Sequence, residues 1–228
     1  MNELTAIVAG GSGLIGGHCL RTLLADDRYA QVIALVRMPL AVRHPKLTQR
    51  TVDFDRLEQV SEFLHADDLF CCLGTTIRNA GSQEEFRKVD FHFPLQLARR
   101  ASSSNVKQFL MVTSLGADPT SSVFYNRVKG EVEQEVVKLP FISIHFFRPS
   151  LLLGNRTESR LGERIGAKTM GILEFLMVGK WRRYRAIKAS VVAHGMVHAA
   201  RLSLPGVHYH ESNVIESMIE TNGAESLK

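Results

Sequence analysis

A tyrosine and a lysine four residues apart, in the segment Tyr125-Asn-Arg-Val-Lys129, are the first candidates for chemistry in this chain. Residues at this spacing share one face of a helix, so the ammonium group can lie beside the phenol. A neighbouring positive charge stabilises a tyrosinate, which moves the phenol towards a range in which it can give and take protons. Thr113 and Ser114 end an apolar run just upstream and place two further hydroxyls near this pair. The structural alternative is a packed tyrosine and a solvated lysine.

Three glycines, Gly10, Gly13 and Gly16, recur at every third position directly after the apolar run Leu4–Val8. One glycine permits a tight turn from strand to helix, a second lets the backbone approach a pyrophosphate, and a third lets the helix pack closely on the sheet. The N-terminus of the following helix offers unpaired N–H groups to phosphate, and Ser12 adds a hydroxyl. The pattern therefore predicts a dinucleotide-binding turn in preference to a purely structural one.

The residue at the end of the next apolar run indicates which dinucleotide is bound. Proteins that bind NAD carry an acidic residue about 20 positions after the glycines, where it accepts hydrogen bonds from the ribose 2′-OH. No Asp or Glu lies between Tyr29 and Val52, and Arg37 follows the run instead. A guanidinium pairs well with a 2′-phosphate. The sequence therefore predicts a preference for NADP(H), with NAD(H) as the second choice and a surface arginine as the structural alternative.

Short β-rich runs alternate with amphipathic segments, which is typical of a parallel sheet covered by helices on both faces. Strands are expected at Leu4–Val8, Gln31–Val36, Leu47–Val52, Leu69–Leu73, Gln108–Val112 and Ile142–Phe147. Helices are expected at Leu14–Ala25, Leu57–Leu64, Glu84–Ser103 with a bend at Pro94, Tyr125–Leu139 and Val191–Leu204. The predicted fold is α/β, a Rossmann-type doubly wound parallel sheet with a small C-terminal substrate-side region.

The 228 residues suit a single domain, with no linker or repeat that divides the chain. We expect a cofactor-binding core over about 1–150, a substrate-side cap over about 151–190, and a C-terminal helix and tail over 191–228 that is polar from Glu211 and frayed at its end. The apolar segment Ile172–Val178 hints at a substrate that is partly apolar.

The charge balance, 28 basic against 23 acidic residues, is too mild to indicate a nucleic-acid partner. The basic cluster Lys180–Arg185 is interpreted as a solvated loop near an anionic cofactor or substrate, with an anionic membrane as the alternative. No apolar run reaches transmembrane length, and no secretory signal is expected. The three cysteines Cys19, Cys71 and Cys72 form no disulfide pattern, which favours a reducing, cytoplasmic compartment. No metal site is expected, because the pair His194/His198 lacks an acidic partner.

Together the turn Gly10–Gly16, the Tyr125/Lys129 pair and Ser114 resemble the short-chain dehydrogenases/reductases. More particular segments resemble the atypical members of the HIV Tat-interacting oxidoreductase family over about residues 3–200. These segments are Phe70-Cys-Cys-Leu-Gly-Thr-Thr76, Ala80-Gly81, Val89-Asp90, Lys129-Gly-Glu-Val-Glu133, Phe147-Arg-Pro149 and Glu158-Ser-Arg160. The asparagine that many short-chain dehydrogenases carry after the fourth strand has no clear counterpart here, and Asp90 is the nearest polar residue. The usual proton relay is therefore not carried over.

The resemblance implies roles at particular positions. Tyr125 is the general acid, and Lys129 binds the nicotinamide ribose and tunes Tyr125. Ser114 or Thr113 orients the substrate carbonyl, with Ser114 as the first choice. The remaining implied cofactor contacts are Gly10, Ser12, Gly13, Leu14, Ile15 and Gly16 for the pyrophosphate, Arg37 for the 2′-phosphate, Asp53 and Phe54 for the adenine, Leu73, Gly74 and Thr75 for the ribose and nicotinamide, and Arg148, Pro149, Ser150 and Leu152 near the carboxamide.

The first functional hypothesis is an NADP(H)-dependent oxidoreductase that passes a hydride to or from a small carbonyl or alcohol substrate. The alternative is a regulator that senses NADP(H) and binds a protein partner with little or no turnover. An intact Tyr125/Lys129 pair favours catalysis, because a sensor does not need it. An epimerase with a retained cofactor is a third hypothesis, although the substrate region is short for a nucleotide sugar. The substrate, the reaction direction and the oligomeric state are left open.

Overall fold

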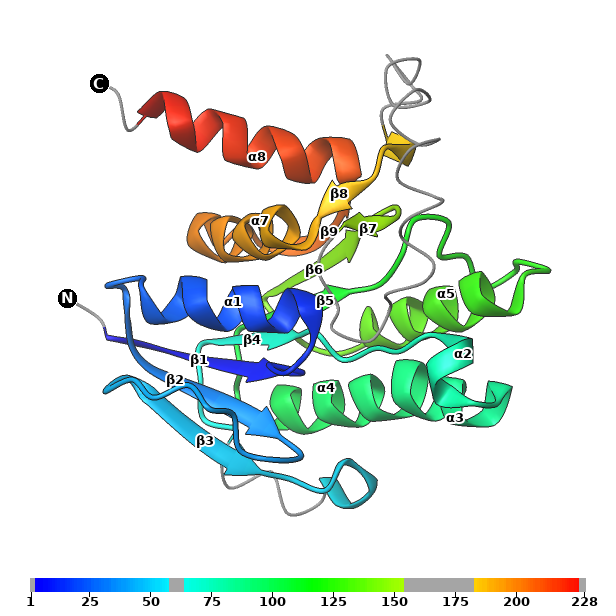
Figure 1. Ribbon diagram of the computed structural model, residues 1–228, viewed down its shortest axis with the longest axis horizontal. Helices are drawn as coiled ribbons and strands as arrows, with labels where there is room; N and C mark the ends of the chain where they lie inside the picture. Colours follow the sequence, from blue (N-terminus) through cyan, green and yellow to red (C-terminus); the bar gives the residue numbers. More distant parts are fainter. Residues whose placement is uncertain (1–2, 58–63, 154–182, 226–228) are drawn as a thin grey trace.

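Seven parallel strands form one sheet among the residues that the computed structural model describes, which are 3–57, 64–153 and 183–225. The strand order is β3-β2-β1-β4-β5-β6-β9 (Figure 1). From β1 the next two strands, β2 and β3, are added on one side, and the strands from β4 on are added on the other side. The strand order therefore reverses between β1 and β4. The strands are β1 (Leu4–Ala9), β2 (Tyr29–Val36), β3 (Leu47–Thr51), β4 (Asp68–Cys71), β5 (Gln108–Val112), β6 (Ser143–Arg148) and β9 (Gly206–Glu211).

Helices cover both faces of this sheet (Figure 1). One face carries α1 (Leu14–Leu24) and α7 (Ala189–Leu202), and α8 (Ser212–Glu225) packs on α7. The other face carries α4 (Phe93–Ser103) and α5 (Phe124–Val136). Alternate residues of β1 enter the two layers of the core, because successive side chains of a strand point to opposite faces. The predicted Rossmann-type doubly wound fold is confirmed.

All seven strands run in the same direction, so their carboxyl ends lie along one edge of the sheet. In open parallel sheets the ligand crevice lies outside these ends, where the strand order reverses. Here that point lies between β1 and β4, whose last residues Ala9 and Cys71 are register partners. The segments that follow the strands are therefore brought together although they are far apart in the sequence.

The predicted helix Glu84–Ser103 is continuous in the structure, but one turn of it is π-helical. The chain forms α2 (Ile77–Ala80) and then α3 (Gln83–Arg87), the π-helical turn η2 (Lys88–His92) and α4, the last three without a gap. Pro94 lies in the first turn of α4, directly after η2. The prediction of one helix is therefore confirmed, and its irregularity lies upstream of the proline, in the π-helical turn that holds Asp90.

The C-terminal region also differs from the prediction. The residues expected to begin a polar tail belong to β9, an edge strand of the main sheet, and to α8. An edge strand buries only part of its side chains, so its apolar alternation is weak; Val207 and Tyr209 are exposed while His210 is buried. Pairing with β6 over the whole of β9 decides the structure here.

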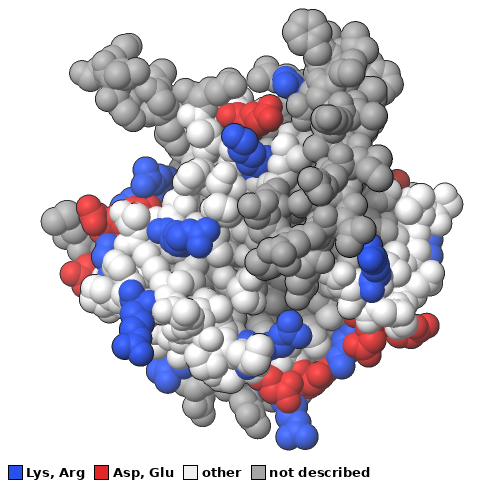
Figure 2. Space-filling view, in the orientation of Figure 1, with Lys and Arg blue, Asp and Glu red and all other residues white. Residues whose placement is uncertain are grey.

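Two predicted segments cannot be compared with the structure. Most of the helix expected at Leu57–Leu64 lies outside the described residues, as do residues 154–182 of the expected cap with its apolar segment. The described ends of the cap pair as β7 (Leu152–Leu153) and β8 (Ile187–Lys188). No helix among the described residues is both long and apolar enough to span a membrane. On the face that Figure 2 shows, the described basic side chains are dispersed among acidic and uncharged ones.

Three histidines from neighbouring strands stack under the helical layer of α7. The rings of His145 and His210 lie 5.2 Å apart with Nδ1 of His145 2.9 Å from Nε2 of His210, and His208 stacks on His145 at 4.8 Å. Burial lowers the pKa of His145 to about 3, with the His210 and His208 rings adding to the effect, and lowers the pKa of His210 to about 4. Both rings are therefore neutral in the folded protein near pH 7.

We expect the stability of the protein to fall as the pH drops from about 6.5 to about 4. In this window the unfolded histidines bind protons that the folded ones exclude, which costs up to about 1.4 kcal/mol per pH unit for each histidine. Urea unfolding at several pH values should show a shallower loss in the His145→Gln/His210→Gln variant than in the wild type. His65→Gln, at an exposed position, is the control. A double variant that loses stability as steeply as the wild type would contradict this account.

Candidate active site

The glycine turn leads from β1 into α1, beside the point where the strand order reverses. Gly10 has a φ of +84°, in the left-handed region that favours glycine. A Cβ on Gly16 would lie 2.1 Å from the carbonyl oxygen of Gly10, so α1 crosses the turn in direct backbone contact. Gly13, whose N–H donates to the Gly10 carbonyl at 2.9 Å, stands directly before the first helical residue. The glycine spacing therefore has the steric basis that the sequence predicted.

The N–H groups at the N-terminus of α1 donate no hydrogen bond to a capping side chain among the described residues. The first turn of this helix, with Leu14 and Ile15, contains no acidic residue. The first N–H groups of a helix have no partner within it, and the helix dipole adds partial positive charge there. Ser12 is exposed in the turn. This end of α1 is consequently suited to an anion such as phosphate.

The residues implied for the adenosine half follow β2 and β3. Arg37 is exposed at the end of β2, and within the described part of the chain its guanidinium has no ionic or hydrogen-bonding partner. Asp53 is also exposed, and its Oδ1 accepts a hydrogen bond from the N–H of Asp55 at 3.0 Å. The ring of Phe54 is buried in the core, 5.8 Å from the ring of Phe93. That ring is not placed to flank an adenine, so this part of the prediction rests on Asp53.

The segment Leu73–Thr75 follows β4 and passes over a buried carboxylate, that of Asp90. The N–H of Thr75 donates to Oδ2 of Asp90 at 2.8 Å. A Cβ on Gly74 would lie 3.2 Å from Oδ1 of the same carboxylate and 3.6 Å from Nζ of Lys129. Leu73 packs against the core layer beneath α4 and α5. The residues that follow β4 therefore lie directly above Lys129.

Lys129 is not a solvated helix lysine. Its side chain is 4% exposed, and Nζ lies 2.7 Å from Oδ1 of the fully buried Asp90. Burial by itself would lower the pKa of Lys129, but the Asp90 carboxylate, together with Tyr125 and Cys71, raises it, so the side chain is an ammonium ion. The structural alternative that the sequence left open for Lys129 is thereby excluded.

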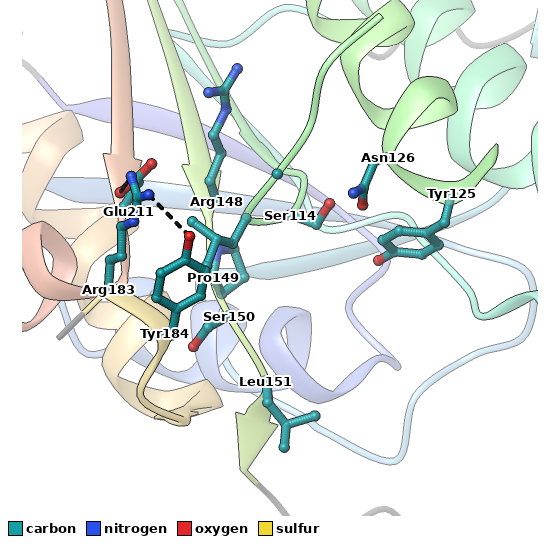
Figure 3. A pocket seen from close by; sticks show the side chains of 12 residues that line it. Ser114, Tyr125, Asn126, Arg148, Pro149, Ser150, Leu151, Arg183, Tyr184 and Glu211 are labelled. Carbon is teal, nitrogen blue, oxygen red and sulfur yellow. Dashed lines mark hydrogen bonds and ion pairs between the residues drawn. The ribbon is translucent and has the colours of Figure 1, made fainter. Parts of the chain in front are cut away.

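A pocket of about 570 Å³ lies at the carboxyl ends of β5 and β6, beside the start of α5 (Figure 3). Tyr125 and Ser114 both line it, and their hydroxyl groups are directed toward the same space. The ring of Tyr125 packs on that of Phe86 with centroids 5.2 Å apart. Ser114 is only 8% exposed, and its Oγ has no hydrogen-bond partner in the described part of the chain. A buried hydroxyl without a partner is costly unless a ligand satisfies it.

The structure distinguishes the two hydroxyl residues at the end of β5. Thr113 donates its hydroxyl hydrogen bond to Oε1 of Glu133 at 2.5 Å, away from the pocket. The buried Glu133 also accepts from both Nε and Nη2 of Arg148, and the guanidinium of Arg148 lies 4.4 Å from the centre of the Tyr209 ring. Thr113 is thus engaged in a structural network with Glu133 and Arg148. Arg148 also lines the pocket, as Ser114 does.

The other residues implied near the carboxamide follow β6. Pro149 accepts a hydrogen bond at its carbonyl from the N–H of Leu115 at 2.9 Å, which ties the ends of β5 and β6 together. Ser150 lines the pocket, but its hydroxyl donates to the carbonyl of Arg185 and accepts from Ser212. Leu152 begins β7 and is partly buried against the core. Pro149 and Ser150 line the pocket, whereas Leu152 does not.

Sequence reasoning missed several residues of the pocket wall. Asn126 follows Tyr125, and Glu211 arrives from the unexpected strand β9. Arg183 and Tyr184 belong to the basic cluster assigned to a solvated loop, and Arg183 lies 3.7 Å from Glu211. Glu133, which binds Thr113 and Arg148, was also missed, although its position inside the family-like segment Lys129–Glu133 was an available signal. The residues of β9 gave no signal for Glu211. Among the described residues, no group of three His, Cys, Asp or Glu side chains is arranged to hold a metal ion.

The cysteines are placed as small apolar residues. Cys71 is buried in β4, and burial raises the pKa of its thiol to about 12. Cys19 is buried in α1, and Cys72, beneath the glycine turn, also has a raised pKa because of the neighbouring Cys19 thiol and burial. All three are free thiols.

Comparison with known proteins agrees with this geometry. A family model described as NAD(P)H-binding matches residues 10–138, more than half of the chain. The protein HTATIP2 of Rattus norvegicus is 34% identical over 202 residues, covering 87% of this chain and 81% of the relative. The mitochondrial protein fmp52 of Aspergillus clavatus is 32% identical over 207 residues, covering 86% of this chain and 87% of the relative.

Solved structures share the fold at low sequence identity. The Bordetella bronchiseptica enzyme WbmH, in complex with NAD+, superposes with a TM-score of 0.70 at 15% identity, over 99% of this chain and 83% of that one. The oxidoreductase ylbE of Lactococcus lactis has a TM-score of 0.66 at 16% identity, over 95% of this chain and 97% of that one. At these identities the likeness shows the Rossmann-type fold alone.

The relatives correct one prediction. Several of them, from Saccharomyces cerevisiae and other fungi, carry the name FMP52 with the word mitochondrial. The prediction of a cytoplasmic compartment is therefore wrong. It depended on the missing disulfide pattern, which separates oxidising from reducing surroundings and does not separate one reducing compartment from another.

The glycine turn at the strand-order reversal, the Tyr125/Lys129 pair beside a pocket, and relatives above 30% identity over most of the chain all agree with the resemblance noted in the sequence. The chain belongs to the NAD(P)H-binding family, among the atypical short-chain dehydrogenase/reductase proteins related to HTATIP2.

Proposed function

We propose that this protein is an NADP(H)-dependent oxidoreductase that interconverts a small carbonyl compound and its alcohol. The observation that carries the proposal is the buried hydroxyl of Ser114, which has no hydrogen-bond partner among the described residues and lines one pocket with Tyr125. The two hydroxyls face the same space, and the ammonium ion of Lys129 lies one helical turn after Tyr125. A carbonyl oxygen in that space would accept hydrogen bonds from both hydroxyls.

The described residues fit a nicotinamide dinucleotide. Gly10, Gly13 and Gly16 keep the turn free of Cβ atoms, and the uncapped first turn of α1 supplies N–H donors for the pyrophosphate. Leu73, Gly74 and Thr75 would line the nicotinamide half above Lys129. When bound, the nicotinamide supplies the hydride donor or acceptor, which no side chain can provide.

The chain's own groups would handle the oxygen and its proton. Ser114 would donate a hydrogen bond from Oγ to the carbonyl oxygen and hold it in position. Tyr125 would transfer the proton at Oη as charge develops on that oxygen. The Lys129 ammonium would stabilise the tyrosinate that this leaves. The packing of Tyr125 on Phe86 would restrict the ring to one orientation.

The preference for NADP(H) rests on Arg37. Its guanidinium is exposed at the end of β2, and no carboxylate in the described part of the chain pairs with it. A guanidinium that keeps its donors available can bind a 2′-phosphate through two parallel hydrogen bonds. The family match supports a nicotinamide dinucleotide without distinguishing NADP from NAD.

The regulatory alternative has less support. A sensor that releases no product needs neither the Ser114 hydroxyl in the pocket nor a buried ammonium ion beside Tyr125. The relatives' names do not include an activity or a partner that would favour it.

Replacement of Arg37 by Ala tests the cofactor preference. We expect the Kd for NADPH to rise by about tenfold or more, because at least one charge-assisted hydrogen bond at an exposed site is lost. The Kd for NADH should stay the same. Calorimetry with both nucleotides measures this. Arg100→Ala, an exposed arginine in the last turn of α4, is the matched control. Equal weakening for both nucleotides would mean that Arg37 does not read the 2′-phosphate.

Replacement of Tyr125 by Phe tests the proton transfer. The ring keeps its packing on Phe86, so NADPH binding should be unchanged, while kcat for any carbonyl that the wild type reduces should fall by about a hundredfold or more. A screen of aldehydes and ketones that follows NADPH absorbance measures turnover, with Tyr209→Phe as the control. A Tyr125→Phe variant that retains the wild-type kcat would overturn the mechanism.

The Ser114→Ala variant removes a hydroxyl that costs stability in the free protein. We expect its free energy of unfolding to equal or slightly exceed that of the wild type, because the substitution removes a buried polar group that has no hydrogen-bond partner among the described residues. In the same carbonyl assay kcat/KM should fall by about tenfold or more. Loss of stability together with unchanged turnover would show that the hydroxyl is structural. If the wild type reduces no carbonyl but binds NADPH, the regulatory alternative gains support.

A further inference from the structure

The sequence predicted a role for Lys129 but none for Asp90, with which it forms an ion pair. Both side chains are buried, with Oδ1 and Nζ 2.7 Å apart. Moving two charges out of water costs as much free energy as their attraction returns, and apolar residues of the same volume would serve stability equally well. A buried ion pair at the floor of a binding site therefore calls for a reason other than stability.

The carboxylate of Asp90 joins three segments of the chain. The π-helical turn η2 carries Asp90 itself, α5 carries Lys129, and the segment after β4 places the N–H of Thr75 2.8 Å from Oδ2. Gly74 passes so close that a Cβ would lie 3.2 Å from Oδ1. Single π-helical turns interrupt helices most often at functional sites, because they redirect one side chain. Here the redirected side chain is Asp90.

We propose that Asp90 is a positioning residue, which holds the ammonium group of Lys129 and the backbone of Gly74–Thr75 in one fixed arrangement beneath the nicotinamide half of the dinucleotide site. The inference rests on the proposed function and deepens it. Asp90 touches neither substrate nor cofactor; it acts through Lys129 and Thr75. Its negative charge is the part that a neutral amide cannot replace.

The charge of Asp90 keeps Lys129 protonated. The groups that face Lys129 are Asp90 from η2, Tyr125 from its own helix and Cys71 from β4. The Cys71 thiol, with a pKa raised by burial to about 12, is neutral between pH 6 and 9. Without the carboxylate, burial would lower the pKa of Lys129 and the ammonium ion would lose its proton as the pH rises through this range.

The Asp90→Asn variant tests the inference, because it keeps the shape and an oxygen for the Thr75 N–H but removes the charge. Calorimetric titration with NADPH from pH 6 to 9 should give a nearly constant Kd for the wild type. In the variant the Kd should rise by about tenfold or more between the two ends of this range, as one charge-assisted hydrogen bond is lost. Adenosine 2′,5′-bisphosphate, which lacks the nicotinamide half, should bind wild type and variant equally.

Two further variants distinguish loss of the charge from misfolding of the protein. Asp90→Glu restores the charge and should restore the flat pH profile in part. Asp90→Asn/Lys129→Met removes both charges, so it should unfold at a denaturant concentration no lower than that of Asp90→Asn and should bind NADPH weakly at every pH. An Asp90→Asn variant that binds NADPH as tightly as the wild type from pH 6 to 9 overturns the inference. Failure of the wild type to bind either nucleotide would instead overturn the proposed function.

Discussion

The contact between the start of α1 and the end of β1 is the constraint on which the rest of the site depends. The backbone of Gly16 lies so close to the carbonyl of Gly10 that a side chain at position 16 would occupy the same space. This approach directs the open end of α1 to the point where the strand order reverses. A bulkier turn would displace α1 outward, and both the core layer that α1 shares with α7 and the donors for phosphate would be lost.

The second half of the site depends on polar contacts instead of close backbone packing. Thr113, Glu133 and Arg148 form one network behind the pocket, and Asp90, Lys129 and Thr75 form another beneath it. Each network joins segments that follow different strands. Since a buried charge must be paired, each one strongly favours a single arrangement of its segments. The Ser114 hydroxyl belongs to neither network and has no hydrogen-bond partner within the described residues, so it can meet a ligand.

The two halves complement each other chemically. The glycine turn and Arg37 offer N–H donors and positive charge to phosphates, while the pocket beside α5 offers the hydroxyl groups of Ser114 and Tyr125. The proposed function needs both, because phosphates would bind at the first half and a carbonyl oxygen at the second. The match to the NAD(P)H-binding family model, over residues 10–138, spans the glycine turn and also Ser114, Tyr125 and Lys129. Arg183 and Glu211 of the pocket wall lie beyond that range.

The sequence by itself determined the fold class, the first six strands and the glycine turn, because local periodicity and backbone sterics act over short stretches of chain. The same holds for Tyr125 and Lys129, whose spacing places them on one helix face. Only the tertiary structure decided that Lys129 is paired with Asp90, that Thr113 turns away while Ser114 faces the pocket, and that Phe54 belongs to the core. The tertiary structure also decided that residues Gly206–Glu211 form β9, because their partly exposed side chains carry a weak apolar pattern. This strand pairs with residues of β6 that lie at least 58 positions earlier in the sequence. These outcomes depend on which buried groups meet across distant segments, and a linear pattern does not contain that information.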